Sequence, residues 1–295
     1  MYKIVEKKEV APSIFSYEIE AKRVAKSAKP GQFIIIRIDE KGERIPLTVA
    51  DYDKEKGTVT IVVQAVGSST NRMAKLNKGD YIMDFAGPLG TPSELIDEDL
   101  EELKKKEIVF VAGGVGAAPV YPQVKWLCER GVFPHVIIGG RSKNFIILEE
   151  EMKKLGAKTY PCTDDGSYGF KGLVTNKLKE LVENGLKIDR VITIGPMIMM
   201  KFVAMLTKEY NIPTIVSLNT LMVDGTGMCG ACRVTVGGEV KFTCVDGPEF
   251  DGHLVDFKEA MRRQNLYKTE EGKMLHKEEE EKEGHVCHIG AGEEA

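Results

Sequence analysis

The most constraining feature of this sequence is a cysteine- and glycine-rich segment in its last third. It reads Asp224-Gly-Thr-Gly-Met-Cys229-Gly-Ala-Cys232, and Cys244 follows in Lys-Phe-Thr-Cys. With Asp224 in place of a first cysteine, the spacing is C-x4-C-x2-C followed by a distant cysteine, which is the plant-type pattern for a 2Fe–2S cluster. Glycines let such a loop approach an inorganic core closely. The segment therefore predicts a metal centre with Asp224, Cys229, Cys232 and Cys244 as ligands.

Zinc is the alternative to iron at this segment. Three thiolates with Asp224 or His253 would complete a closed tetrahedral zinc site. The N-terminus lacks the apolar run of a signal peptide, so we expect a cytoplasmic protein, in which clustered thiols indicate metal rather than disulfides. A second, weaker candidate for metal binding is His285-Val-Cys287-His288. The choice between iron and zinc depends on the rest of the chain.

Charge and hydropathy exclude two classes of partner. The chain has 295 residues and a net charge of −4, so it lacks the basic excess that phosphate backbones attract. No segment approaches the roughly 18 consecutive apolar residues of a membrane span. We therefore expect neither nucleic acid nor a membrane as a partner.

The first third of the chain predicts an antiparallel β barrel. Short apolar or alternating runs at 32–38, 57–64 and 80–85 are separated by turn-forming residues. Two motifs in this part could bind an anion. Arg44-Ile-Pro-Leu-Thr48 offers a charge and a hydroxyl, and Gly67-Ser-Ser-Thr70 precedes a helical segment with unpaired amides. Taken alone, each motif is better explained by an ordinary structural role, Arg44 as a surface cation and the second motif as a plain helix cap.

The middle of the chain alternates strands and helices, as a parallel α/β layer does. The buried-type run 107–112 leads into Gly113-Gly-Val-Gly-Ala-Ala-Pro119, a strand–turn–helix pattern that presents amides to a pyrophosphate. We expect further ligand-binding loops at 163–169 and 195–199, and 213–218 as the strand that closes the sheet. Arg141 and Lys143 would favour a 2′-phosphate, whereas Asp164 and Asp165 would favour ribose hydroxyls. The expected helices and strands of this layer are 120–130, 135–140, 148–155, 158–162, 174–183, 190–195 and 196–210.

In order and motif, the chain resembles the ferredoxin–NADP reductase superfamily, and the resemblance covers about residues 1–262. The resemblance lies in the barrel, the R-x-P-x-T strand, the glycine-hydroxyl loop, Gly87-Pro-Leu-Gly90 and the G-x-G-x-x-P turn. It implies FAD binding on the barrel and NAD(H) binding on the α/β layer. The implied FAD residues are Arg44, Pro46, Leu47, Thr48, Val49, Gly67, Ser68, Ser69 and Thr70. The implied NAD(H) residues are Gly114, Gly116, Ala118, Pro119, Asp164, Asp165, Gly166, Gly195 and Pro196.

The cluster segment resembles one branch of that superfamily. The order of motifs, with Met-Cys-Gly-Ala-Cys-Arg-Val near the end, is similar to electron-transfer subunits of dihydroorotate dehydrogenase. Aspartate as first ligand resembles the small subunits of NADH-dependent reduced ferredoxin:NADP oxidoreductases, also called sulfide dehydrogenase subunits. With the flavin and nucleotide motifs upstream, the cluster is expected to be 2Fe–2S rather than zinc.

These resemblances imply an oxidoreductase subunit that works with a larger flavin and iron–sulfur subunit. Electrons would pass between NAD(H), FAD and the cluster. The alternatives are a dihydroorotate dehydrogenase or hydrogenase electron-transfer subunit and, from another class, a zinc-binding regulatory module. The expected domains are an FAD barrel at 1–98, an NAD domain at 99–220, a cluster domain at 221–262 and a charged tail at 263–295.

Overall fold

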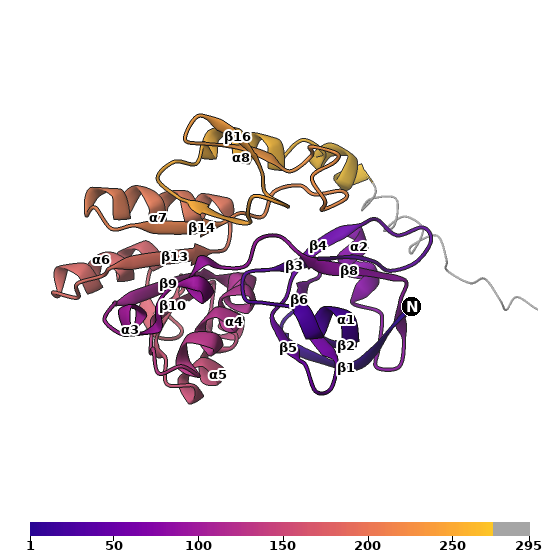
Figure 1. The fold of residues 1–295 in the computed structure, drawn as a ribbon, viewed down its shortest axis with the longest axis horizontal. Helices are drawn as coiled ribbons and strands as arrows, with labels where there is room; N and C mark the ends of the chain where they lie inside the picture. Colours follow the sequence, from indigo (N-terminus) through magenta and orange to yellow (C-terminus); the bar gives the residue numbers. More distant parts are fainter. Residues whose placement is uncertain (274–295) are drawn as a thin grey trace, which may run out of the picture.

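The computed structural model of this chain describes residues 1–273. It contains two antiparallel sheets, a largely parallel sheet and a small hairpin (Figure 1). The predicted fold class, an antiparallel barrel with a parallel α/β layer and a small C-terminal segment, is confirmed. The predicted metal candidate at His285, Cys287 and His288 lies outside the described residues.

In the N-terminal part, strands β2 and β6 largely alternate buried and partly exposed side chains, whereas the first four residues of β3 are all buried. One sheet has the order β5-β6-β2-β1-β7 and the other β4-β3-β8. Both sheets contribute to one apolar core, with Tyr17 and Ile61 from the first and Ile34, Ile36 and Phe85 from the second. The shared core is what makes the two sheets a barrel. The elements are β1 (Tyr2–Ala11), β2 (Ile14–Glu20), α1 (Lys22–Ser27), β3 (Phe33–Arg37), β4 (Ile45–Thr48), β5 (Asp51–Asp53), β6 (Thr58–Gln64), α2 (Ser68–Met73), β7 (Tyr81–Ile82) and β8 (Asp84–Leu89).

The α/β layer has helices on both faces of one sheet. Alternate residues of β9 explain this, because Phe110 faces the core under α4 and α5, whereas Val109 and Val111 face the core under α6 and α7. The sheet order is β12-β11-β10-β9-β13-β14-β17. The elements are α3 (Leu100–Leu103), β9 (Ile108–Gly113), α4 (Ala117–Cys128), β10 (His135–Gly140), α5 (Glu149–Lys154), β11 (Lys158–Thr163), β12 (Phe170–Lys171), α6 (Val174–Glu183), β13 (Arg190–Ile194), α7 (Met197–Glu209) and β14 (Thr214–Ser217).

The expectation that 213–218 closes the sheet was wrong. Strand β17 (Glu249–Asp251) comes after the cysteine segment and pairs antiparallel with β14, for instance Phe250 with Val216. Sequence periodicity does not reveal such a return, because β17 is only three residues long. The chain thus leaves the sheet after β14, forms the cysteine segment and comes back to the same edge.

The cysteine segment is anchored on both sides. Its hairpin consists of β15 (Arg233–Val236) and β16 (Glu239–Phe242), and helix α8 (Phe257–Gln264) follows and packs against α7. In Figure 1 this C-terminal part lies across the end of both the barrel and the α/β layer. It is therefore placed to contact both.

Polar side chains tie the three parts together. Lys125 of α4 forms an ion pair with Asp51 of the barrel at 2.8 Å. Gln123 Nε2 donates to Glu249 Oε1 at 2.7 Å, and Ser93 Oγ donates to Gln123 Oε1 at 3.2 Å. Burial raises the pKa of Glu249 to about 7. Among the described residues, no helix has both the length and the apolar character needed to cross a membrane.

Candidate functional site

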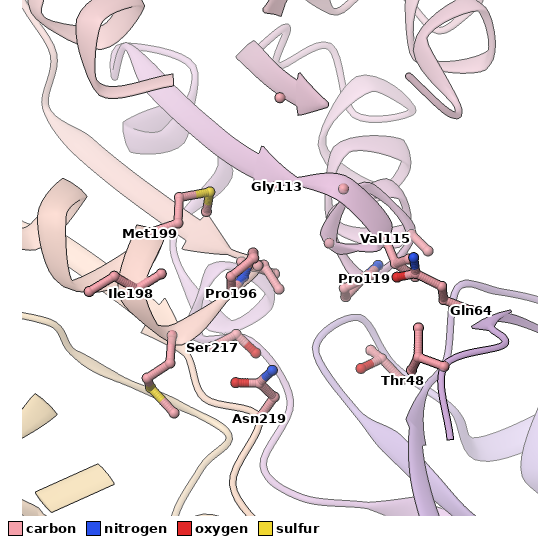
Figure 2. A pocket seen from close by; sticks show the side chains of 18 of the residues that line it. Thr48, Gln64, Gly113, Val115, Pro119, Pro196, Ile198, Met199, Ser217 and Asn219 are labelled. Carbon is pink, nitrogen blue, oxygen red and sulfur yellow. The ribbon is translucent and has the colours of Figure 1, made fainter. Parts of the chain in front are cut away.

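A cavity of about 1130 Å³ lies between the barrel and the α/β layer. Figure 2 shows Thr48 and Gln64 from the barrel on one side, and Pro196, Ser217 and Asn219 from the α/β layer on the other. The predicted site residues that line it are Pro46, Leu47, Thr48, Thr70, Gly114, Gly116, Ala118, Pro119, Asp164, Gly195 and Pro196. The structure thus brings both predicted nucleotide motifs to one cavity, although they are far apart in the sequence.

Several predicted site residues lie outside the lining of this cavity. Val49 is buried in the barrel core, and Asp165 and Gly166 form an exposed turn in which Asp165 Oδ1 accepts from Ser167 N–H at 2.9 Å. Hydrogen bonds from the hydroxyl and from the amide of Ser167 lower the pKa of Asp165. The other members of this group are Arg44, Gly67, Ser68 and Ser69.

The barrel side of the cavity is formed by strand β4. Its residues Pro46, Leu47 and Thr48 pair with β3, and Thr48 lies opposite Phe33. Arg44 precedes the strand and is exposed, and within residues 1–273 it has no ion-pair partner. An exposed, unpaired guanidinium beside the cavity wall has the charge and geometry to bind a phosphate.

The glycine-hydroxyl loop forms the rim of the same wall. Thr70 Oγ1 accepts from the N–H groups of Val66 and Gly67 at 3.0 and 2.9 Å and donates to the Gly67 carbonyl. Ser69 donates to Glu43 at 2.8 Å and is buried. Thr70 therefore stabilises the loop in the way expected of a helix cap, while it also lines the cavity.

On the α/β side, the turn after β9 needs glycine for steric reasons. A Cβ atom on Gly116 would lie 2.2 Å from the Ile194 carbonyl oxygen of neighbouring strand β13. Gly114 has φ +56°, and a Cβ atom placed on it would meet no other atom within 4 Å. The close approach of two strand ends leaves backbone amides and the start of α4 at the cavity, an arrangement that suits a pyrophosphate.

Sequence reasoning missed a third wall of the cavity. Met261, Gln264, Asn265 and Lys268 line it from α8 and the residues just after it. Their approach depends on how α8 packs on α7, which no local motif signals. Met197 and Met199 of α7 also line the cavity.

The four predicted metal ligands form two pairs that are in contact, Asp224 with the Cys229 amide and Cys232 with Cys244, and they differ in exposure. Cys232 and Cys244 are buried, with their sulfur atoms 3.2 Å apart, whereas Cys229 is exposed. The pKa of the Cys244 thiol is raised to about 12, mainly by burial and secondly by the contact with Cys232. Among residues 1–273, no group of three or more His, Cys, Asp or Glu side chains converges in a ready metal-binding geometry.

Asp224 holds the loop through its carboxylate. Oδ1 accepts from Thr226 N–H at 2.6 Å and Oδ2 from Cys229 N–H at 2.8 Å. These contacts lower the pKa of Asp224, and the hydrogen bond from the Thr226 amide has the largest effect. Asp224 thus orders the loop that carries Cys229, a role that the sequence did not indicate.

The surroundings of the sulfur atoms suit an anionic cluster bound by thiolates. The amide of Ala231 lies 3.5 Å from Cys229 Sγ, and that of Cys244 lies 3.5 Å from Cys232 Sγ. Amide donors of this kind stabilise thiolate-bound clusters. In contrast, the His253 ring contacts the Thr207 hydroxyl at 3.1 Å, so a zinc site that uses His253 finds no support.

Comparisons with known proteins agree with this arrangement. Residues 1–93 match the oxidoreductase FAD-binding domain, and residues 219–256 match the iron–sulfur cluster binding domain of dihydroorotate dehydrogenase B. A Thermotoga maritima homologue of the dihydroorotate dehydrogenase B (NAD(+)) electron transfer subunit is 45% identical over 268 residues, which cover 91% of this chain and 92% of the homologue. The corresponding subunit of Fusobacterium nucleatum is 34% identical, with 84% and 94% covered.

A solved structure extends the similarity to three dimensions. A chain in the structure of the NADH-dependent reduced ferredoxin-NADP oxidoreductase, determined in work on flavin-based electron bifurcation, is 43% identical. The two chains superpose with a TM-score of 0.87, covering 94% of this chain and 97% of the other. The chain therefore belongs to the family of dihydroorotate dehydrogenase B electron-transfer subunits and their homologues, as a flavin and iron–sulfur oxidoreductase subunit.

Proposed function

We propose that this chain transfers electrons between NAD(H) and a larger partner subunit, through FAD and a 2Fe–2S cluster. The observation that carries the proposal is the position of the cysteines relative to the barrel strand of the flavin motif. Cys232 and Cys244 share a buried cluster with Phe33 and Ile35 of β3, and β3 pairs directly with β4. Neighbouring strands lie about 4.8 Å apart, so the proposed flavin and cluster sites are close neighbours.

The residues that line the cavity and those beside it have distinct roles in this proposal. Pro46, Leu47 and Thr48 form the wall for the flavin, and exposed Arg44 binds its pyrophosphate, which the glycine-hydroxyl loop Gly67–Thr70 caps. The turn from Gly114 to Pro119 receives the nucleotide pyrophosphate, and Gly195 and Pro196 leave room for it. The remaining residues of the proposed flavin and nucleotide sites are Val49, Asp164, Asp165 and Gly166.

The cofactors supply the chemistry and the chain supplies placement. When bound, FAD would accept two electrons as a hydride and release them one at a time. An iron–sulfur cluster carries one electron at a time. Apolar packing of Met222, Leu89 and Phe242 around the cysteines keeps water away from that side of the cluster site. Of the domain divisions expected from the sequence, we keep 1–98 for FAD, 99–220 for NAD(H) and 221–262 for the cluster. The expected tail at 263–295 would begin inside α8, so we extend the cluster part to Gln264, where this helix ends.

We infer a larger flavin and iron–sulfur subunit as the partner. The support is the match, over nearly the whole length of both chains, to a chain of the NADH-dependent reduced ferredoxin-NADP oxidoreductase. Electron bifurcation in such a complex is part of this inference. The second candidate is an electron-transfer subunit of dihydroorotate dehydrogenase, which the Thermotoga and Fusobacterium relatives favour.

An anaerobic titration with NADH tests the proposal. We expect the protein loaded with FAD and iron to show flavin bands and a broad iron–sulfur absorbance, and both should bleach when NADH is added. NADPH is the matched comparison and should act less efficiently. A colourless, zinc-loaded protein, or flavin bands that NADH leaves unchanged, would contradict the proposal.

Asp224 is proposed as the fourth ligand, and its loop contacts allow the ligand role to be separated from the structural one. Replacing Asp224 with cysteine should keep a cluster with an altered electron paramagnetic resonance (EPR) spectrum and potential, because ligand identity affects both. Replacing Asp224 with asparagine retains an Oδ acceptor for Thr226 but removes the charge. We therefore expect Asp224→Asn to change the spectrum and weaken cluster retention about tenfold or more.

The control for this prediction is Asp246→Asn. Asp246 Oδ2 accepts from Phe242 N–H at 2.6 Å in the same segment, but we assign it no ligand role. A wild-type spectrum in Asp224→Asn or in Asp224→Ala would show that Asp224 only orders the loop.

A further inference from the structure

Helix α8 places an arginine on the loop between Cys229 and Cys232. Arg263, in the last turn of the helix, donates from Nη2 to the carbonyl of Ala231 at 2.9 Å. The amide of the same Ala231 lies 3.5 Å from Cys229 Sγ. Ala231 is thus fixed at both ends, by the arginine at its carbonyl and by a proposed ligand at its amide.

The Arg263 guanidinium is not neutralised by a carboxylate. Within residues 1–273 it has no ion-pair partner, and its Nε is buried without a hydrogen-bond acceptor. A partly buried charge is screened less than an exposed one, and a buried donor without an acceptor is unfavourable. Arrangements of this kind are kept where a neighbouring anionic group compensates for the cation.

A 2Fe–2S cluster held by three thiolates and a carboxylate is such an anionic group. Two ferric ions, two sulfides and four singly charged ligands give an oxidised centre of charge −2, and uptake of one electron makes it −3. A fixed cation close to the loop stabilises the reduced form more than the oxidised form. The reduction potential should therefore depend on Arg263.

We propose that Arg263 is a positioning residue for the cluster, which fixes Ala231 and raises the reduction potential of the centre. This inference rests on the proposed function, because it requires the cluster. Helix α8 carries both Arg263, which contacts the cysteine loop, and Gln264, which lines the cavity. One helix thereby contacts both proposed redox sites.

The test is a redox titration of the iron-loaded protein, followed by EPR. Arg263→Gln removes the charge but keeps a donor for the Ala231 carbonyl, whereas Arg263→Lys keeps the charge. At a fixed solution potential near the midpoint, Arg263→Gln should lower the ratio of reduced to oxidised cluster three- to tenfold, about 28 to 59 mV for one electron. Arg263→Lys should remain near the wild-type value.

Arg262→Gln is the matched control, because Arg262 is an exposed neighbour on the same helix without a contact to the loop. It should leave the potential unchanged. A wild-type potential in Arg263→Gln, or an equal shift in Arg262→Gln, would overturn the inference. If Arg263→Gln does not retain iron, Arg263→Lys decides: a wild-type potential supports the role of the charge, and a potential shifted by tenfold or more contradicts it.

The result is separable from the outcome for the proposed function. A wild-type protein without an iron–sulfur spectrum would refute the cluster itself. A normal wild-type spectrum with no effect of Arg263→Gln would refute only the role of Arg263.

Discussion

Replacing Cys244 with alanine is expected to remove the iron–sulfur absorbance while NADH still bleaches the flavin. Cys244 is buried beside Cys232, and the described residues offer no spare cysteine in this segment to take its place. Loss of one of four ligands should lower cluster retention by at least ~100-fold, since even outer-shell changes cost 10–100-fold in metal affinity. The flavin should be unaffected, because Cys244 does not line the cavity. Absorbance and iron content of the purified protein measure the first effect, and stopped-flow reduction by NADH measures the second.

Cys128→Ala is the matched control for this variant. Cys128 is also a buried thiol, and burial raises its pKa to about 11, but it belongs to the core under α4. This control should retain iron, flavin and electron transfer. The prediction also extends to the complex, in which Cys244→Ala should stop electron flow to the partner subunit. An unchanged iron content in Cys244→Ala would contradict the proposed ligand set, and loss of flavin reduction would contradict the separation of the two sites.

The elements of the fold that the sequence predicted correctly are those whose signals are local. The apolar run before Gly113 gives a buried strand, and the glycine pattern that follows gives a sharp turn with no space for a side chain at Gly116. The same holds for the strand–turn–strand pattern of the barrel. In each case the hydrophobic period and the turn residues agree with the final packing.

Contacts between residues far apart in the chain could not be predicted from local sequence patterns. Strand β17 is too short to show a period, and its pairing with β14 depends on the path of the chain around the cysteine segment. The approach of Met261 and Gln264 to the cavity depends on the packing of α8. Asp224 illustrates a different limit, because one spacing is compatible with a metal ligand and with a loop cap. Only the two amide contacts reveal the second role.

The second prediction with a large expected effect concerns Gly116, in the glycine turn of the α/β layer. In Gly116→Ala, the new methyl group would lie 2.2 Å from the Ile194 carbonyl oxygen and 3.0 Å from Gly195 Cα. These are backbone atoms of a central strand and the residue after it, so no side-chain rotation relieves the clash. The turn must move away from β13, and this should lower the free energy of unfolding by about 2–3 kcal/mol, as overpacking does.

The same displacement should disturb nucleotide binding, because Gly116 and Gly195 both line the cavity. We expect the apparent NADH affinity of Gly116→Ala to fall about tenfold or more, equivalent to about 1.4 kcal/mol.

Gly185→Ala is the matched control, since Gly185 has φ +91° and a methyl group there would meet no other atom within 4 Å. It should cost about 1 kcal/mol of stability through backbone strain alone and leave NADH affinity unchanged. Urea unfolding and NADH titration of the two variants measure both effects. Equal NADH affinity in both variants would show that the nucleotide does not depend on the turn at Gly116, and would remove the main structural support for placing it there.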